Sequence, residues 1–384
     1  MEMRSLPFLS ELASKLSTTA IDDSVDILHC LLTASLYASA ALFITLKKHA
    51  GAPIECWLSQ TYTQQWNEFA EAFCLHTNTY WCPDASLYEV PENYRELYRI
   101  HYYQWTSMYF TMACALFVFP KFVWNYSQNF TNVSLPYFCE ETSKIHHETC
   151  QRGWKVDEMV ASLRDKLHAG AVYRRLRLIF MFIIVKMLYL FLAIGQFFFL
   201  AFFLGQRTDI FWGWKLFNNL LNGVTWTTTG MFPRTTFCEF KVREMAGNNR
   251  EETIECEIGL NAFHEKIFLF LWFWLLFVIG VSCLGIIQSI KSVHGNAIVR
   301  SLLHTIHIEG DKKQKRCIED FINNFLWYDG KLVIHFVKRQ SPIVAEEFAL
   351  KLYREYLDDN MTDEELEDTY SESALSDDTM ENMD

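Results

Sequence analysis

The chain has 384 residues, of which 51% are hydrophobic and 16% aromatic, and its formal net charge is −12. Twelve acidic residues and no Lys or Arg lie in residues 358–384, so the remainder of the chain carries equal numbers of acids and bases. This balance excludes a basic surface for nucleic acid. The aromatic residues gather in four long apolar segments, which argues against a set of soluble domains.

The first apolar segment (24–46) follows a short mixed segment (1–23) that has no signal-peptide pattern. Within it, His29, Thr33 and Tyr37 recur every four residues and form one polar stripe of a helix. A polar stripe inside a membrane faces either protein or water. The sequence leaves both alternatives open: the stripe lines a pore, or it packs against neighbouring helices.

The second apolar segment (102–124) begins with the sequence Tyr-Tyr-Gln-Trp at residues 102–105. The segment is long enough to cross a bilayer as a helix, and aromatic rings at its start are typical of the headgroup boundary. Pro120 lacks the N–H of a helical hydrogen bond, so we expect a kink near the end of this span.

The third (178–204) and fourth (267–290) apolar segments complete a set of four transmembrane helices. Lys186 lies eight residues into the third, and we expect it to reach the membrane surface or to pair with an acid. Four further segments connect or follow the spans: two loops, a polar helix-prone segment and a helical region, at 47–101, 205–266, 125–177 and 291–357. The acidic tail (358–384) is expected to be disordered.

Five of the eleven cysteines lie in the two loops, at positions 56, 74, 82, 238 and 256. No Cys-x-x-Cys occurs, so we predict no metal site, and disulfides place the loops on the oxidising, extracellular side. The three other segments, counted as 1–24, 121–177 and 291–384, hold 22 Lys and Arg, against 11 in the loops. This excess predicts that both termini and the middle segment are cytoplasmic. The sequons at Asn125, Asn129 and Asn132 would then remain unmodified.

The spacing of four loop cysteines favours one pairing. Cys56 and Cys74 are 18 positions apart, and so are Cys238 and Cys256. Antiparallel neighbouring segments would pair Cys56 with Cys256 and Cys74 with Cys238, which nests the two loops. The alternative is closure within each loop, because four cysteines allow three connectivities. Cys82 is left over in either case.

No catalytic set is present. The chain contains no Walker phosphate loop, no Gly-x-Ser-x-Gly elbow and no His-Glu-x-x-His. We therefore predict no catalytic residue, no metal and no cofactor. The predicted fold class is an all-α membrane protein with four transmembrane helices, two disulfide-braced extracellular loops and a helical cytoplasmic region.

Several short sequences together resemble the innexin family of gap-junction proteins. They are Pro53-Ile54-Glu55-Cys56-Trp57, the Tyr-Tyr-Gln-Trp at 102–105, which is that family's signature, and Met231-Phe232-Pro233-Arg234. The resemblance covers roughly residues 27–289. Ala52 is a departure, because the family usually has an acidic residue there.

The resemblance implies a function. Subunits, alone or mixed with other innexins, form a ring, an octamer, that docks with the ring of an adjacent cell through the extracellular loops. The channel passes ions and small molecules across two plasma membranes at a gap junction, surrounded by membrane lipids. The family also implies that the N-terminal segment forms a pore funnel, which places Met1, Met3, Asp22 and Asp23 there.

Two other functions are compatible with four spans. One is an undocked plasma-membrane hemichannel, as in the related pannexins, and the other is a tetraspan adhesion or scaffold protein without a pore. The predicted extracellular loops carry no sequon that would block docking. Their similar lengths, 55 and 62 residues, differ from the one small and one large loop typical of the adhesion class.

Overall fold

The computed structural model describes residues 21–59, 62–77, 79–82, 92–131, 133–147, 152–168, 177–205, 209–224, 230–243, 249–294, 299 and 312–360. These residues belong to two compact units. The unit that we call the terminal unit comprises Met1–Ile27, Pro120–Tyr189 and Val281–Asp384, and the loop unit comprises Leu28–Phe119 and Leu190–Gly280. Each boundary between the units falls inside one of the four long apolar helices.

Among the described residues, four helices are long and apolar enough to cross a membrane, and they confirm the tetraspan fold. They cover Ser24–Ala50, Tyr102–Phe130, Arg177–Phe203 and Asn261–Ser292. The first consists of α2 (Ser24–Ile27), a π-helical turn η1 (Leu28–Thr33) and α3 (Ala34–Ala50). The others are α6 (Tyr102–Ser127) with the short η2 (Gln128–Phe130), α10 (Arg177–Phe203) and α13 (Asn261–His294). The fourth helix thus begins six residues before the predicted apolar span.

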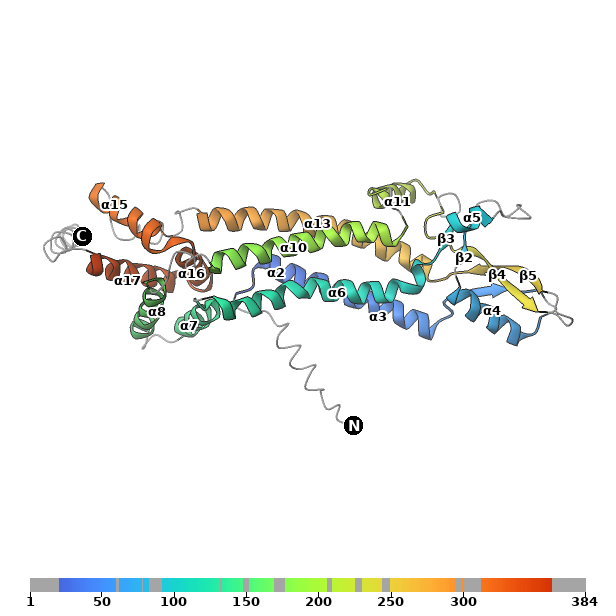
Figure 1. Cartoon of the computed structure of the whole chain (residues 1–384), viewed down its shortest axis with the longest axis horizontal. Coiled ribbons are helices and arrows are strands. Elements are labelled where there is room, and N and C mark those ends of the chain that lie inside the picture. Colours follow the sequence, from blue (N-terminus) through green and yellow to red (C-terminus); the bar gives the residue numbers. More distant parts are fainter. Residues whose placement is uncertain are drawn as a thin grey trace, which may run out of the picture. The chain divides into compact units, whose positions relative to one another are not determined.

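The loop unit contains a five-stranded antiparallel sheet that the sequence analysis did not predict (Figure 1). Its strands are β1 (Glu55–Trp57), β2 (Thr79–Tyr80), β3 (Arg99–Ile100), β4 (Thr235–Arg243) and β5 (Asn249–Glu257). The order is β1-β5-β4-β2-β3, so the hairpin from the second loop lies between strands from the first. Because backbone hydrogen bonds join the two loops at both edges of the hairpin, the loops form one structure.

The described part of the loop unit also contains the helices α4 (Gln64–His76), α5 (Glu92–Leu97) and α11 (Trp212–Leu221). Trp66, Phe69 and Phe73 recur at helical spacing within α4. In α11, Gly213 lies against the Trp272 ring of α13, where a Cβ atom would come within 2.4 Å of a ring carbon. Glycine at this position therefore permits close contact between α11 and α13.

The terminal unit gathers helices from two distant segments around one core. α7 (Leu135–His147) and α8 (Arg152–His168) come from the middle segment. α15 (Lys312–Asp320), the π-helical η3 (Phe321–Phe325), α16 (Trp327–Gln340) and α17 (Pro342–Asn360) follow the fourth span. The core contains Phe138 of α7 beside Phe348 of α17, with ring centroids 6.2 Å apart. The helical region predicted after the fourth span thus shares its core with the middle segment.

Asp329 of α16 caps the N-terminus of α10. Its carboxylate accepts hydrogen bonds from the backbone N–H groups of Leu178 (3.3 Å) and Ile179 (3.0 Å). The first N–H groups of a helix have no partner within the helix, so this side chain satisfies two of them. Asp329 is buried, and burial raises the pKa of its carboxyl to about 7, although both N–H donors act in the opposite direction.

This burial predicts how stability depends on pH. An unfolded Asp has a pKa of about 3.9, so between about pH 4 and pH 7 the folded state binds more protons than the unfolded state. The free energy of unfolding then falls as pH rises through that range. Asp329→Asn stays neutral, and we expect its Tm to exceed that of the wild type at pH 8, with the difference shrinking toward pH 5.

Thermal unfolding of the detergent-solubilised full chain, followed at several pH values, measures this effect. Asp320→Asn is the matched control, since Asp320 is an exposed acid of the same region. A constant difference in Tm between Asp329→Asn and the wild type across the pH range would contradict the prediction.

Candidate functional site

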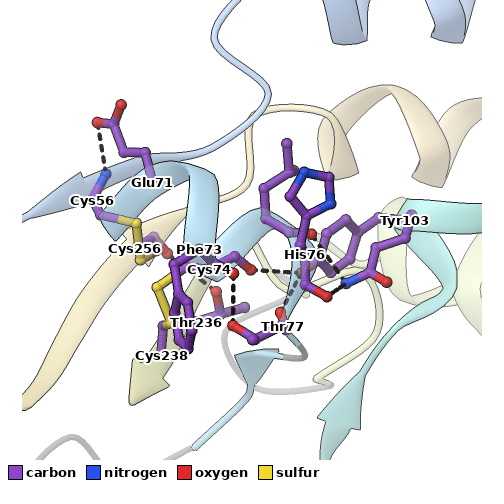
Figure 2. Close-up of a disulfide and its surroundings, with 12 residues drawn as sticks. Cys56, Glu71, Phe73, Cys74, His76, Thr77, Tyr103, Thr236, Cys238 and Cys256 are labelled. Atoms are coloured by element: carbon purple, nitrogen blue, oxygen red, sulfur yellow. Dashed lines mark hydrogen bonds between the residues drawn. A yellow bond between two sulfur atoms is a disulfide. The ribbon is translucent and has the colours of Figure 1, made fainter. Parts of the chain in front are cut away.

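Two disulfides join the first loop to the second. Cys56 of β1 is bonded to Cys256 of β5, and Cys74 of α4 is bonded to Cys238 of β4 (Figure 2). This is the nested pairing, and neither bond closes a loop on itself. Cys56 and Cys256 lie directly opposite each other in the β1–β5 ladder. The fifth loop cysteine, Cys82, is buried and lies outside both bonds.

The two disulfides are adjacent and buried. The Sγ atoms of Cys56, Cys74 and Cys256 all lie within 4.8 Å of one another, and the four bonded cysteines are at most 2% exposed. Oxidised sulfurs do not offer the thiolates that a metal ion requires, so the cluster is a covalent brace. Each bond closes a long stretch of chain, with sequence separations of 200 and 164 residues.

The Tyr-Tyr-Gln-Trp sequence at the start of α6 holds the end of α4. The Tyr103 hydroxyl donates to the carbonyls of Cys74 (3.3 Å) and Thr77 (3.4 Å), as Figure 2 shows. The Gln104 amide donates to the carbonyls of Leu75 (3.0 Å) and His76 (3.1 Å). The last carbonyls of a helix have no partner within it. These two side chains therefore bind the carbonyls at the end of α4 and the one that follows it, beside the Cys74–Cys238 disulfide.

Only one of the three aromatic rings at the start of α6 is exposed. Tyr102 and Tyr103 are buried, whereas Trp105 is 56% exposed. Tyr102 packs edge-on against Phe232 of the second loop and His264 of α13, with ring centroids 5.7 and 6.0 Å apart. Both tyrosines therefore face the folded loops rather than lipid, and their position at the headgroup boundary stays a prediction.

The polar stripe of the first span faces protein. His29, Thr33 and Tyr37 are completely buried. Tyr37 packs against Phe117 of α6 (centroids 5.4 Å apart), and the Thr33 hydroxyl accepts a hydrogen bond from the Trp274 indole of α13 (3.1 Å). Of the two alternatives that the sequence leaves open, these contacts support packing between helices of one subunit.

Lys186 is held by two acids from the start of the first span. Its ammonium lies 2.7 and 2.8 Å from the two carboxylate oxygens of Asp26, and 3.0 Å from the carboxylate of Asp23. Lys186 and Asp26 are both at least 94% buried. Pairing, one of the two roles expected for this lysine, is thus the one present.

Asp22 and Asp23 connect the same region to two further elements. The Lys121 ammonium of α6 lies 2.8 Å from the Asp22 carboxylate, in a pair that is almost fully buried. The Arg339 guanidinium of α16 donates to the Asp23 carboxylate and to the Asp22 carbonyl. We name Asp22, Asp23, Asp26, Lys121, Lys186 and Arg339 the ionic cluster.

Three other predicted features remain predictions. Met1 and Met3, expected in the pore funnel, lie outside the described residues. Asp22 and Asp23 belong to the ionic cluster, which fixes the chain where it enters α2. Pro120 is buried within α6, and the helix continues past it to Ser127.

Comparison with known proteins identifies the family. The innexin family model matches residues 22–356. The chain is an innexin. It is 45% identical to Innexin-8 of Caenorhabditis elegans, over 93% of this chain and 94% of that protein. It is 30% identical to Innexin unc-9 and 28% identical to Innexin-3 of the same organism, over 88% and 92% of this chain and 92% and 88% of those proteins. As a member of this channel-forming family, the innexin is a gap-junction channel subunit.

We expect the two bonded pairs of cysteines to act as two units. Cys56→Ser and Cys256→Ser each remove the same bond, so each should abolish coupling between cells, and the double mutant should be little worse than either single mutant. Peptide mapping without reduction should recover the Cys56 peptide linked to the Cys256 peptide. Cys82→Ser is the control and should retain coupling. A Cys56 peptide linked to the Cys74 peptide would refute the nested pairing.

Lys186→Met should destabilise this innexin strongly. The substitution leaves the Asp26 carboxylate buried without its counter-charge, which costs about 3–5 kcal/mol. Lys186→Met combined with Asp26→Leu should restore much of that loss, because both charges are then removed. Unfolding of the detergent-solubilised protein measures the effect.

Lys215→Met is the matched control for Lys186→Met. Lys215 pairs with Asp209, but its side chain is 66% exposed, so the loss should be at most about 1 kcal/mol. If Lys186→Met were no more harmful than Lys215→Met, the ionic cluster would not contribute to stability.

Proposed function

We propose that this innexin assembles, alone or with other innexin subunits, into an octameric ring in the plasma membrane. Two rings from adjacent cells dock through the two loops and form a path for ions and small molecules. In this arrangement the loops are extracellular, and both termini are cytoplasmic. The two disulfides support the orientation of the loops, and the larger number of Lys and Arg in the other segments supports it independently.

One observation carries the docking proposal: the two loops form a single braced body. Strands from both loops share one sheet, and two buried disulfides cross between them. A surface that must meet its counterpart on another cell loses less conformational entropy on binding if it is already ordered. The loop unit is built in this way.

The pore funnel is the second part of the proposal. We place residues from Met1 to about Asp23 at the cytoplasmic mouth of the pore. The ionic cluster supports this position. It holds Asp22 and Asp23 against α6, α10 and α16, and so fixes the point at which the N-terminal segment joins the first span.

Paired cells that express only this innexin test the docking proposal. We expect injected dye and junctional current to pass between them, and Cys74→Ser, which breaks one brace, to abolish both. Current in single cells without coupling in pairs would instead favour the undocked, pannexin-like channel. Silence in both, with the protein present at the cell surface, would contradict a homomeric channel. Co-expression with a second innexin would then separate a mixed channel from an adhesion protein.

A further inference from the structure

α11 is an amphipathic helix whose outer face is apolar. Trp212 and Leu216 on its inner face are buried. Phe211, which immediately precedes the helix, and Trp214 and Leu221 within it are 68%, 56% and 70% exposed. Their spacing places these three side chains on the face opposite the buried one. Large apolar side chains gathered on one exposed face indicate a surface that binds a partner.

The inner face of α11 rests against the fourth span. The Trp272 indole of α13 donates a hydrogen bond to the Ile210 carbonyl (3.2 Å). The same ring lies so close to Gly213 that a Cβ atom there would come within 2.4 Å of it. Phe217 packs against Phe273, with ring centroids 5.4 Å apart. Figure 1 shows α11 beside α13 and the end of α10. The span itself therefore determines where α11 lies.

These contacts place α11 at a definite depth. Trp272 lies five residues beyond the start of the predicted apolar span at residue 267, about 8 Å along the helix axis. Trp272 also packs against Phe197 of α10, with ring centroids 5.8 Å apart. Phe197 lies six residues before the end of α10, again about 9 Å along the axis. Helices that lie in a membrane interface bury their apolar face by about 5–10 Å. Both spans therefore place α11 at interfacial depth.

The charges of this segment narrow the partner further. Within residues 209–224 the charged residues are Asp209 and Lys215, and they pair at 2.5 Å. The segment thus has no net charge with which to select anionic headgroups. Tryptophan and other amphipathic aromatic rings favour the boundary between headgroups and acyl chains, and the Lys215 side chain is long enough to reach the headgroups.

We propose that the outer face of α11 binds zwitterionic phospholipid at the membrane interface. Phe211, Trp214 and Leu221 lie among the upper parts of the acyl chains, and the Lys215–Asp209 pair lies at the headgroups. The helix thereby anchors the second loop to the bilayer at the level where the spans leave it. The leaflet is the outer one if the loops are extracellular, and this assignment alone rests on the proposed function.

Photoactivatable phosphatidylcholines test the depth of α11. The purified full-length innexin is reconstituted in phosphatidylcholine vesicles that contain a lipid with a carbene precursor either at the top of an acyl chain or at its end. The modified peptides are then mapped. We expect the shallow probe to label residues 209–224 several-fold more than the deep probe does, because an interfacial helix lies near the headgroups. Replacing part of the lipid with phosphatidylserine should leave this labelling unchanged.

A pair of double variants tests the apolar face. Phe211→Gln combined with Trp214→Gln should lower the shallow labelling of residues 209–224 several-fold, and a water-soluble carbene precursor should then label the segment more strongly. Trp66→Gln combined with Phe69→Gln is the matched control, since these α4 rings are 40% and 54% exposed in the same unit. It should leave the labelling of α11 unchanged. All four side chains are exposed, so both variants should keep the elution volume of the wild type in size-exclusion chromatography.

Three results would each overturn the lipid-binding face. Stronger labelling of wild-type α11 by the water-soluble precursor than by the shallow lipid would show that the face lies in water. A photoreactive amino acid in place of Trp214 that cross-links to a second copy, and not to lipid, would show that a neighbouring subunit covers the face. Labelling that rises with phosphatidylserine would show selection of anionic lipid. Labelling by lipid requires no docking between cells, so this test and that of the proposed function can fail separately.

Discussion

A charge inside a membrane span needs a counter-charge from the protein itself, and this constraint organises the terminal unit. Lys186 in the third span is paired with Asp26 in the first, and Lys121 at the end of the second is paired with Asp22. Hydrocarbon offers neither ions nor hydrogen bonds, so these pairs fix which helix ends lie together. Apolar contacts alone determine less strongly which helices become neighbours, because lipid tails solvate an apolar helix face as well as another helix does.

In the loop unit, disulfide bonds and a β-sheet hold the elements together. Three of its five strands are short: β1 contains three residues, and β2 and β3 contain two each. Strands of this length are marginal alone, so the sheet depends on the β4–β5 hairpin and on the two disulfides. The signature residues Tyr103 and Gln104 extend the same body to the second span, since they bind the end of the helix that carries Cys74.

The sequence predicted the spans and the favoured cysteine pairing, because both leave one-dimensional signals. An apolar run of about 20 residues predicts a membrane span. An equal spacing of 18 residues between the cysteines of each loop favours two loops that lie side by side and are bonded at both ends. The short strands β1, β2 and β3 left no such signal, because a strand of two or three residues has no period. β4 and β5 have nine residues each and alternate buried with more exposed side chains, a period of two that was not recognised in the sequence. The polar stripe was ambiguous for a different reason. Periodicity says that His29, Thr33 and Tyr37 share a face, but not what lies opposite that face. The residues that decide this, Phe117 and Trp274, are distant in sequence.

The members of the ionic cluster could not be grouped from the sequence, because they lie far apart along the chain. Asp23 and Arg339 are separated by 316 positions, and nothing local to either predicts the other. Their contact has a mechanical consequence within the terminal unit. Asp23 immediately precedes α2, and Arg339 lies in the last turn of α16, which also caps α10 through Asp329. A displacement of α16 must therefore break or carry with it contacts at the starts of two spans. Residues that follow the fourth span are thereby coupled to the segment that enters the first, through the Arg339–Asp23 contact.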